Sequence, residues 1–137
     1  HNSMVTLSFE NNYDELKNIM KNYFGSNTGL LIYGKIELMI MKACLLKNTF
    51  KATNCHICKD NKTYKLIDRN KEEYEILTLP QTHTSYILNC HTTNLIDKIP
   101  SYQEIGITNF RVDLSSETIE ETVNIIEQIM LKFNINN

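Results

Sequence analysis

Hydrophobic and polar positions in the first third of the chain predict a strand, a helix and a second strand. Val5–Phe9 is apolar and β-branched, as strands commonly are. Asn11-Asn12 and the acidic residues that follow are typical of a helix start, where asparagine caps the backbone and the helix dipole favours negative charge. A loop at Gly25–Gly29 ends the helical spacing. The unbroken apolar run Gly29–Gly34 then predicts a strand buried on both faces, as in a parallel sheet.

The middle of the chain is polar and predicts a β-hairpin. Tyr64–Ile67 and Tyr74–Leu77 are expected to pair across a type I turn at Asp68–Lys71, because aspartate and asparagine stand where that turn prefers them. Tyr86–Leu88 is another short apolar run, which we expect to return to the main sheet.

The last third resumes the alternation of helix and strand. Asn94–Ile105 predicts a helix that is interrupted or restarted at Pro100 and ended by Gly106. Ile107–Leu114 has the period of two that is typical of a strand. Its apolar face holds Phe110, Val112 and Leu114. Its polar face holds Asn109, Arg111 and Asp113.

A final helix is expected after this strand, capped by Ser115-Ser116. Glutamates near its start and Lys132 near its end suit the helix dipole. The side chains at helical spacing that we expect to be buried are Ile119, Val123, Ile126, Met130 and Phe133.

The order of the elements is βαβ, an antiparallel insert and αβα, which predicts an α/β fold. We expect one α/β domain over residues 4–137, with a cysteine-containing β insertion at about 44–90. Residues 1–3, ahead of Met4, are expected to be a tag remnant. Three parallel strands are few for an independent domain, so we expect a fragment of a longer protein. Its open apolar sheet edge predicts a homodimer or other self-association.

The composition excludes several classes of protein. The chain has 137 residues, of which 42% are hydrophobic and 22% charged, and this describes a globular chain rather than a disordered one. No apolar stretch approaches the ~18 residues of a membrane span. No apolar leader precedes the first strand, so we expect a cytoplasmic protein. The net charge of −2 means that any RNA-binding surface would have to be local.

Four cysteines carry the clearest candidate chemistry. Cys55 and Cys58 are separated by two residues, a spacing that lets both thiolates reach one metal ion from a tight turn. We expect Cys44 as a third ligand and Cys90 as the fourth, with His83 as the alternative fourth ligand. Two other interpretations stay open, namely reduced thiols that are buried as small hydrophobes, and disulfide or redox chemistry.

Charged residues at the ends of strands are the candidate substrate-binding groups. Arg111 and Asp113 lie two residues apart on a strand, where charge is costly unless the two groups pair or hold a ligand; a structural salt bridge is the alternative. Lys35 and Glu37 follow the second strand in the same relative place. Arg69, one of only two arginines, lies in the hairpin turn, where exposure to solvent is the simpler interpretation.

Several catalytic motifs are absent from the sequence. It has no glycine-rich phosphate loop, no His-Glu-x-x-His motif and no nucleophile elbow around a serine. A catalytic cysteine with histidine and aspartate can be assembled from most chains of this size, so that combination carries little weight.

Short motifs over residues 5–116 resemble peptidase family U32, the collagenase-like peptidases. The order and spacing of the motifs carry this resemblance more than any one of them. The matching positions are Tyr33-Gly34-Lys35, Leu38-Met39, Cys44, Cys55-x-x-Cys58, Tyr64-x-Leu66, Asp68-Arg69, Ile87-Leu88-Asn89, and Gly106 through Arg111-x-Asp113. The chain departs from the family pattern at Lys35, where the family has arginine.

The resemblance implies the last strands and helices of a (β/α) barrel-like fold with an inserted antiparallel β-hairpin. The later barrel strands would be Val5–Ser8, Leu30–Gly34 and Phe110–Asp113, and the earlier strands would lie outside this chain.

The resemblance also implies two kinds of activity. Family members were first described as proteases, and several relatives act in the hydroxylation of RNA or of quinones and carry an iron–sulfur cluster on four cysteines. By this resemblance Cys44, Cys55 and Cys58 are ligands of a cluster or of zinc. The fourth family cysteine corresponds more nearly to His83 than to Cys90. The expected substrate is therefore RNA or a peptide, and a fragment without activity of its own is the third alternative.

Overall fold

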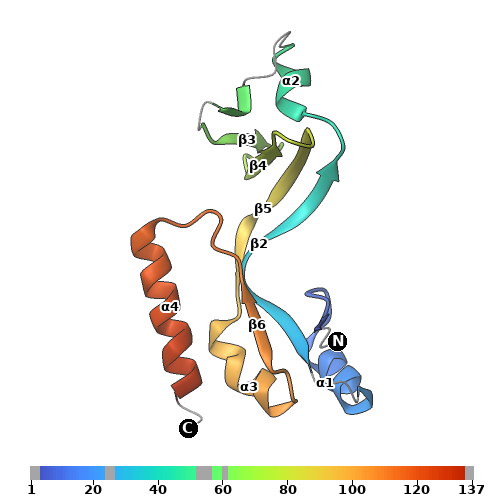
Figure 1. Cartoon of the computed structure of the whole chain (residues 1–137), viewed down its shortest axis with the longest axis vertical. Coiled ribbons are helices and arrows are strands. Elements are labelled where there is room, and N and C mark those ends of the chain that lie inside the picture. The colour runs from blue at the N-terminus through green and yellow to red at the C-terminus, as the bar shows by residue number, and fades with distance from the viewer. Residues whose placement is uncertain (1–3, 24–26, 52–56, 60–61, 135–137) are drawn as a thin grey trace. The chain divides into compact units, whose positions relative to one another are not determined.

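The computed structural model describes residues 4–23, 27–51, 57–59 and 62–134, and its elements are labelled in Figure 1. These residues form a mixed α/β fold, which confirms the α/β part of the predicted fold class. They divide into two compact units. One unit falls within His1–Gly34 and Thr93–Asn137, and the other is Lys35–Thr92.

Three parallel strands form the sheet of the first unit. The strands β1 (Val5–Thr6) and β6 (Asn109–Val112) both pair in parallel with β2 (Thr28–Met41). In the register, Val5 lies opposite Thr28 and Leu30 lies opposite Phe110. The prediction of three neighbouring parallel strands is confirmed.

The helix α1 (Tyr13–Asn22) begins where the sequence predicts. Asn12 caps it, because the Asn12 side chain accepts a hydrogen bond from the Glu15 N–H and the Glu15 carboxylate accepts one from the Asn12 N–H. The predicted later helix is likewise interrupted, into the 3-10 helix η2 (Ile96–Lys98) and α3 (Ile99–Glu104), and Pro100 lies in the first turn of α3.

A single hydrophobic cluster holds the first unit together. The parallel strands, the helices and the loops between them all contribute to it. Its buried members are Leu7, Leu16, Leu30, Ile32, Ile96, Ile99, Tyr102, Ile107 and Ile125.

The helix α4 (Ile119–Asn134) differs from its prediction in its cap and in its buried face. Its N-terminal hydrogen bonds come from Thr118 rather than from Ser115-Ser116, since the Thr118 hydroxyl accepts from the Glu121 N–H and the Thr118 N–H donates to the Glu121 carboxylate. The Glu121 pKa is lowered by these hydrogen bonds to Thr118.

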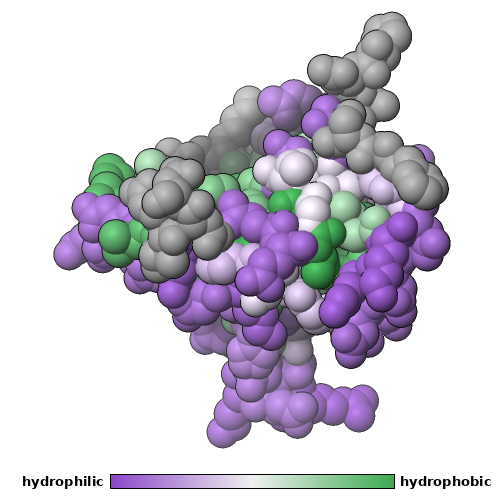
Figure 2. Space-filling view, turned by 90° about the horizontal axis from the view of Figure 1, so that it is seen from below, coloured by the Kyte–Doolittle hydropathy of each residue, from purple (hydrophilic) through white to green (hydrophobic). Residues whose placement is uncertain are grey.

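The predicted buried stripe of α4 is wrong in four of its five members. Ile119 is 86% exposed, and about half of each of the next three side chains is exposed; we call these four residues the exposed stripe: Ile119, Val123, Ile126 and Met130. Phe133, the fifth predicted member, does pack against the core, where Ile125 and Ile129 take the place of the other four. Hydrophobic side chains are visible at the surface on the side of α4 in Figure 2.

Tertiary contacts fix the rotation of α4. The Phe133 ring meets the Phe110 ring of β6 edge-on, with centroids 5.7 Å apart. On the same side of the helix, Lys132 forms an ion pair with Asp97 at 2.8 Å. Because the apolar residues of α4 form two adjacent stripes, their periodicity alone does not decide which stripe is buried.

The second unit contains the predicted hairpin. Strand β3 (Tyr64–Ile67) pairs antiparallel with β4 (Glu73–Leu79), and β4 pairs antiparallel with β5 (Thr84–Asn94). The Lys71 N–H donates to the Asp68 carbonyl and closes the turn between β3 and β4. The short helices α2 (Leu45–Thr49) and η1 (Ile57–Lys59) complete the unit.

Two strands are longer than predicted. β2 was expected to end at Gly34 but continues to Met41, and β5 extends well beyond Tyr86–Leu88. Gly34 has φ +135, so it lets the strand pass a tight point instead of ending it. In the described residues the strand order is β1-β2-β5-β4-β3, with β6 also on β2, and this sheet is not closed into a barrel.

Among the described helices, none combines the length and the apolar character needed to cross a membrane.

Candidate functional site

Cys44 lies beside the first residues of β5. It is 8% exposed and caps α2, where its Sγ accepts a hydrogen bond from the Lys47 N–H at 3.4 Å. The next residue, Leu45, donates its N–H to the Oγ of the fully buried Ser85 at 3.0 Å. The expected ligand Cys44 is thus held at the end of the hairpin formed by β4 and β5.

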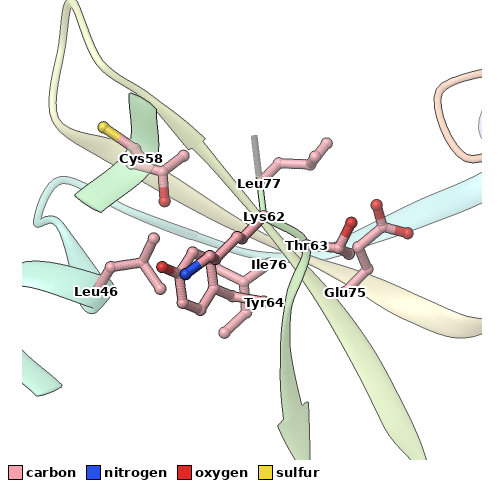
Figure 3. Close-up of a pocket in the computed structure, with 9 residues that line it drawn as sticks. Leu46, Cys58, Lys62, Thr63, Tyr64, Glu75, Ile76 and Leu77 are labelled. Carbon is pink, nitrogen blue, oxygen red and sulfur yellow. The ribbon is translucent and has the colours of Figure 1, made fainter. Parts of the chain in front are cut away.

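Cys58 lies in η1 and borders a hollow at the same end of that hairpin (Figure 3). Leu46 of α2 and Leu77 and Thr78 of β4 also line this hollow. The 3-10 helix that carries Cys58 and the helix that follows Cys44 are in contact. The fold therefore brings the elements that carry two of the expected ligands together.

His83 is in the turn that joins β4 to β5, two residues before Ser85. Its φ of 54 is in the left-handed region. The alternative fourth ligand is therefore at the hairpin end where Cys44 is held. Cys55, the remaining expected ligand, is outside the described residues.

Cys90 is in a different part of the second unit. It follows Ser85 by five residues along the extended β5, which corresponds to about 16 Å. The donor atoms of Glu72, Cys90 and His91 all lie within 4.8 Å of one another. Among the residues that the structure describes, this is the one group of three or more such side chains at that separation.

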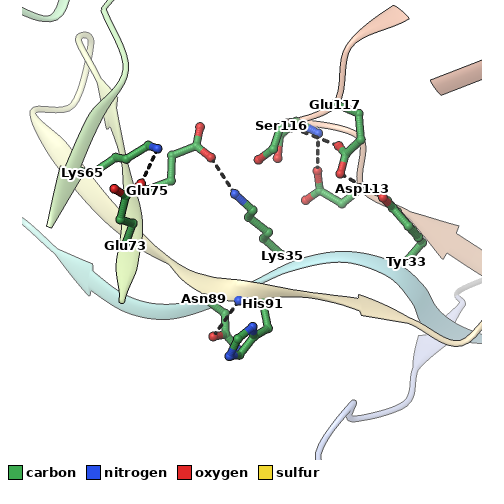
Figure 4. Close-up of polar contacts among 11 residues, drawn as sticks. Tyr33, Lys35, Lys65, Glu73, Glu75, Asn89, His91, Asp113, Ser116 and Glu117 are labelled. Carbon is green, nitrogen blue, oxygen red and sulfur yellow. Dashed lines mark hydrogen bonds and ion pairs between the residues drawn. The ribbon is translucent and has the colours of Figure 1, made fainter. Parts of the chain in front are cut away.

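Three of the predicted substrate-binding residues are in the second unit. Lys35 forms an ion pair with Glu75 at 3.0 Å, and both side chains are largely buried (Figure 4). Glu37 and Arg69 are exposed. The exposure of Arg69 agrees with its interpretation as a solvated turn residue.

Arg111 and Asp113 are in the first unit and do not form the structural salt bridge that was considered, since the ion pairs of the described residues include neither of them. Arg111 is exposed. The Asp113 N–H donates to the Tyr33 carbonyl at 2.9 Å, and the Asp113 Oδ1 accepts from the Ser115 N–H at 3.1 Å. Asp113 therefore fixes the end of β6 and the chain that leads to α4.

Tyr33 and Glu117 are two functional candidates that the sequence did not single out. The Tyr33 Oη donates to a Glu117 carboxylate oxygen at 3.2 Å, where the carboxyl end of β6 meets the interior of β2 beside Asp113 (Figure 4). Burial raises the Tyr33 pKa, and the negative charges of Glu117 and Glu121 raise it further. Glu117 could be read from the sequence only as an acidic residue near a helix start, so no local signal marked this contact.

The arrangement contains two distinct kinds of chemistry. The second unit holds sulfur and imidazole donors, and the first unit holds carboxylates at the carboxyl ends of parallel strands, where α/β folds bind ligands. A family model described as Peptidase family U32 matches residues 2–132. Neither the curated proteins nor the solved structures give a significant match. Since the matched family model spans nearly the whole sequence, the chain belongs to peptidase family U32.

Proposed function

We propose that the unit Lys35–Thr92 is a metal-binding part of a U32 enzyme, with a site at the end of the β4–β5 hairpin. Its ligands would be Cys44, Cys55 and Cys58, and a fourth group, for which we now prefer His83 to Cys90. The observation that carries this proposal is the hydrogen bond from the Leu45 N–H to the Ser85 Oγ at 3.0 Å. It holds Cys44 close to the turn that contains His83.

The choice of His83 rests on distance along β5. Cys90 lies about 16 Å beyond Ser85, far more than the span of one ion and its ligands. His83 is only two residues from Ser85 on the other side.

The donor set fits a soft metal centre. Thiolates with one imidazole are typical ligands of zinc, and cysteine-rich sets also hold iron–sulfur clusters. When bound, zinc would link Cys58 to Cys44, whereas a cluster would also supply electron transfer. Buried Cys44 and half-buried Cys58 are both shielded from bulk solvent, as such ligands usually are.

The activity that we propose is the hydroxylation of an RNA substrate, carried out by the longer protein to which this chain would belong. The charge distribution supports an anionic substrate at the second unit. Residues 35–92 contain nine Lys and Arg and six Asp and Glu, whereas the rest of the chain contains five and ten. A local excess of positive charge is what binding to a phosphate backbone requires.

Anaerobic purification with metal and sulfide analysis tests the metal site. We expect bound zinc, or iron with sulfide, in the unaltered protein and its loss in Cys44→Ser and Cys58→Ser. His83→Ala is expected to lower the metal content of this site, and Cys90→Ser to leave it unchanged. Absence of both metals, or a content that Cys44→Ser and Cys58→Ser do not alter, would contradict the proposal.

Hydrolysis of peptide bonds is the second candidate, and the description of the matched family favours it. The residues that we would assign to it are Tyr33, Asp113 and Glu117, because they gather polar groups at the carboxyl end of the parallel strand β6. The test is cleavage of gelatin and of collagen peptides. Asp113→Asn should abolish cleavage, whereas cleavage that the substitution leaves unchanged would reject this assignment.

A further inference from the structure

Glu72, Cys90 and His91 form a three-donor cluster that the hairpin-end site does not use. One donor atom from each residue lies within 4.8 Å of the other two. Cys90 and His91 are consecutive on β5, and Glu72 directly precedes β4. Chain segments that are about 20 residues apart in the sequence therefore converge at this point.

The turn before Glu72 is held by several hydrogen bonds. The Asp68 Oδ1 accepts from the N–H groups of Asn70, at 2.8 Å, and Glu72, at 2.9 Å. The Asp68 N–H donates to the Glu72 carbonyl at 3.1 Å. Lys71, between them, has φ 67. The backbone of Glu72 is thus anchored at both its N–H and its carbonyl before any ligand binds.

The other two donors also have supporting contacts. The Asn89 Oδ1 accepts a hydrogen bond from the His91 N–H at 3.4 Å (Figure 4). It also accepts one from the Cys90 thiol at 3.6 Å. Tyr74 donates through its Oη to Asp68 at 3.4 Å, and its pKa is raised chiefly by a hydrogen bond with Cys90. Residues that orient ligands in this way commonly surround metal sites.

The three side chains form a ligand set that suits zinc. Zinc binds thiolate, imidazole and carboxylate groups, and zinc sites in enzymes often use three protein ligands and leave the fourth position to water. With the usual bond lengths, donor atoms in such a site lie about 3.5 Å apart. A contraction of about 1.3 Å from the observed limit of 4.8 Å is within the reach of side-chain rotation, since His91 is exposed.

We propose that Glu72, Cys90 and His91 bind one Zn²⁺ ion in an open, three-ligand site that is separate from the cysteine site at the hairpin end. The distance along β5 prevents the two sites from sharing an ion. This proposal does not depend on the proposed function, because it uses none of the ligands assigned there.

The test is titration of the whole chain with Zn²⁺ after the metal has been removed with a chelator. It is made in the Cys44→Ser/Cys58→Ser background, which removes the hairpin-end thiolates, and in the unaltered sequence. One equivalent of Zn²⁺ should bind in the altered background. Co²⁺ in its place should give an absorption band from a thiolate ligand, which would identify a cysteine at the metal.

In that background, Cys90→Ser should abolish the thiolate band, and His91→Ala and Glu72→Gln should each weaken Zn²⁺ binding by roughly tenfold or more. Asn89→Ala should weaken it by about tenfold without removing the band. Glu73→Gln is the matched control, since the neighbouring carboxylate is already paired with Lys65, and it should change nothing.

Far-ultraviolet circular dichroism checks that each variant is folded. The proposal is overturned if folded protein in the altered background binds no Zn²⁺, or if binding persists unchanged in Cys90→Ser and His91→Ala. If the unaltered chain binds no more Zn²⁺ than the altered background does, the hairpin-end site is rejected and this one stands, so the two failures are distinguishable.

Discussion

Gly34 of β2 lies so close to Asp113 that a Cβ added at Gly34 would be 2.7 Å from the Asp113 Cβ and 2.9 Å from the Asp113 carbonyl oxygen. Real Cβ atoms do not approach other atoms so closely. With its φ of +135, Gly34 is the residue that allows β2 to pass the end of β6.

Gly34→Ala should therefore lower the free energy of unfolding by roughly 2 kcal/mol or more, because it adds both backbone strain and a steric clash. Gly29→Ala is the matched control on the same strand. There the new Cβ meets only the flexible side chain of Met4, and φ is not in the left-handed region. Urea unfolding measures both variants, and equal losses would contradict this explanation of Gly34.

The hydrogen bond between Tyr33 and Glu117 predicts a pH dependence. The Tyr33 pKa is raised in the folded state by burial and by the charge of Glu117, so the unfolded chain loses this proton first as pH rises. Stability from Tyr33 is thus fully present below about pH 10 and declines as pH rises towards the folded-state pKa.

Tyr33→Phe should remove this decline at high pH. At neutral pH it should lower the free energy of unfolding by about 1 kcal/mol, because the hydrogen bond to Glu117 is lost. The measurement is the free energy of unfolding of the unaltered chain and of Tyr33→Phe from about pH 8 to about pH 11, the range in which tyrosine titrates. Tyr102→Phe serves as the comparison, because the Tyr102 pKa is raised chiefly by burial and not by a carboxylate. An identical pH profile for Tyr33→Phe and the unaltered chain would contradict the prediction.

The rotation of α4 predicts opposite results for two adjacent isoleucines. Ile125 is 8% exposed and belongs to the core, whereas Ile126 is 48% exposed. Ile125→Ala should cost roughly 2–4 kcal/mol of stability, since it opens a cavity in the core. Ile126→Ala should cost well under half of that, and thermal unfolding would distinguish the two. Similar losses would mean that the exposed stripe is covered in solution.

Self-association stays a prediction, and we expect the contact between copies to form at the open edges of the parallel sheet in the first unit. In the described residues β1 and β6 each pair only with β2, which leaves open parallel edges in the first unit. We expect light scattering to show a dimer or larger species whose share rises with protein concentration. A monomer at every concentration would exclude this.

The sequence by itself determined those features that depend on neighbouring residues. Asp68–Lys71 predicted the hairpin turn because the side chain of Asp68 satisfies backbone groups within the same turn. Asn12 marked the start of α1 for the same reason, and the period of two in Phe110 and Val112 identified the buried face of β6. The ordered cysteine, glycine and arginine motifs identified the family.

The tertiary structure decided what depends on contacts between distant residues. Packing of Ile125 and Ile129 against the core decides which apolar stripe of α4 is buried, since both stripes have helical spacing. The sequence grouped Cys90 with the other cysteines by residue type, but the extended β5 separates it from Cys44 and brings it, with its neighbour His91, to Glu72. Strand pairing converts distances along the chain into distances in space, and residue types and spacing alone do not contain that information.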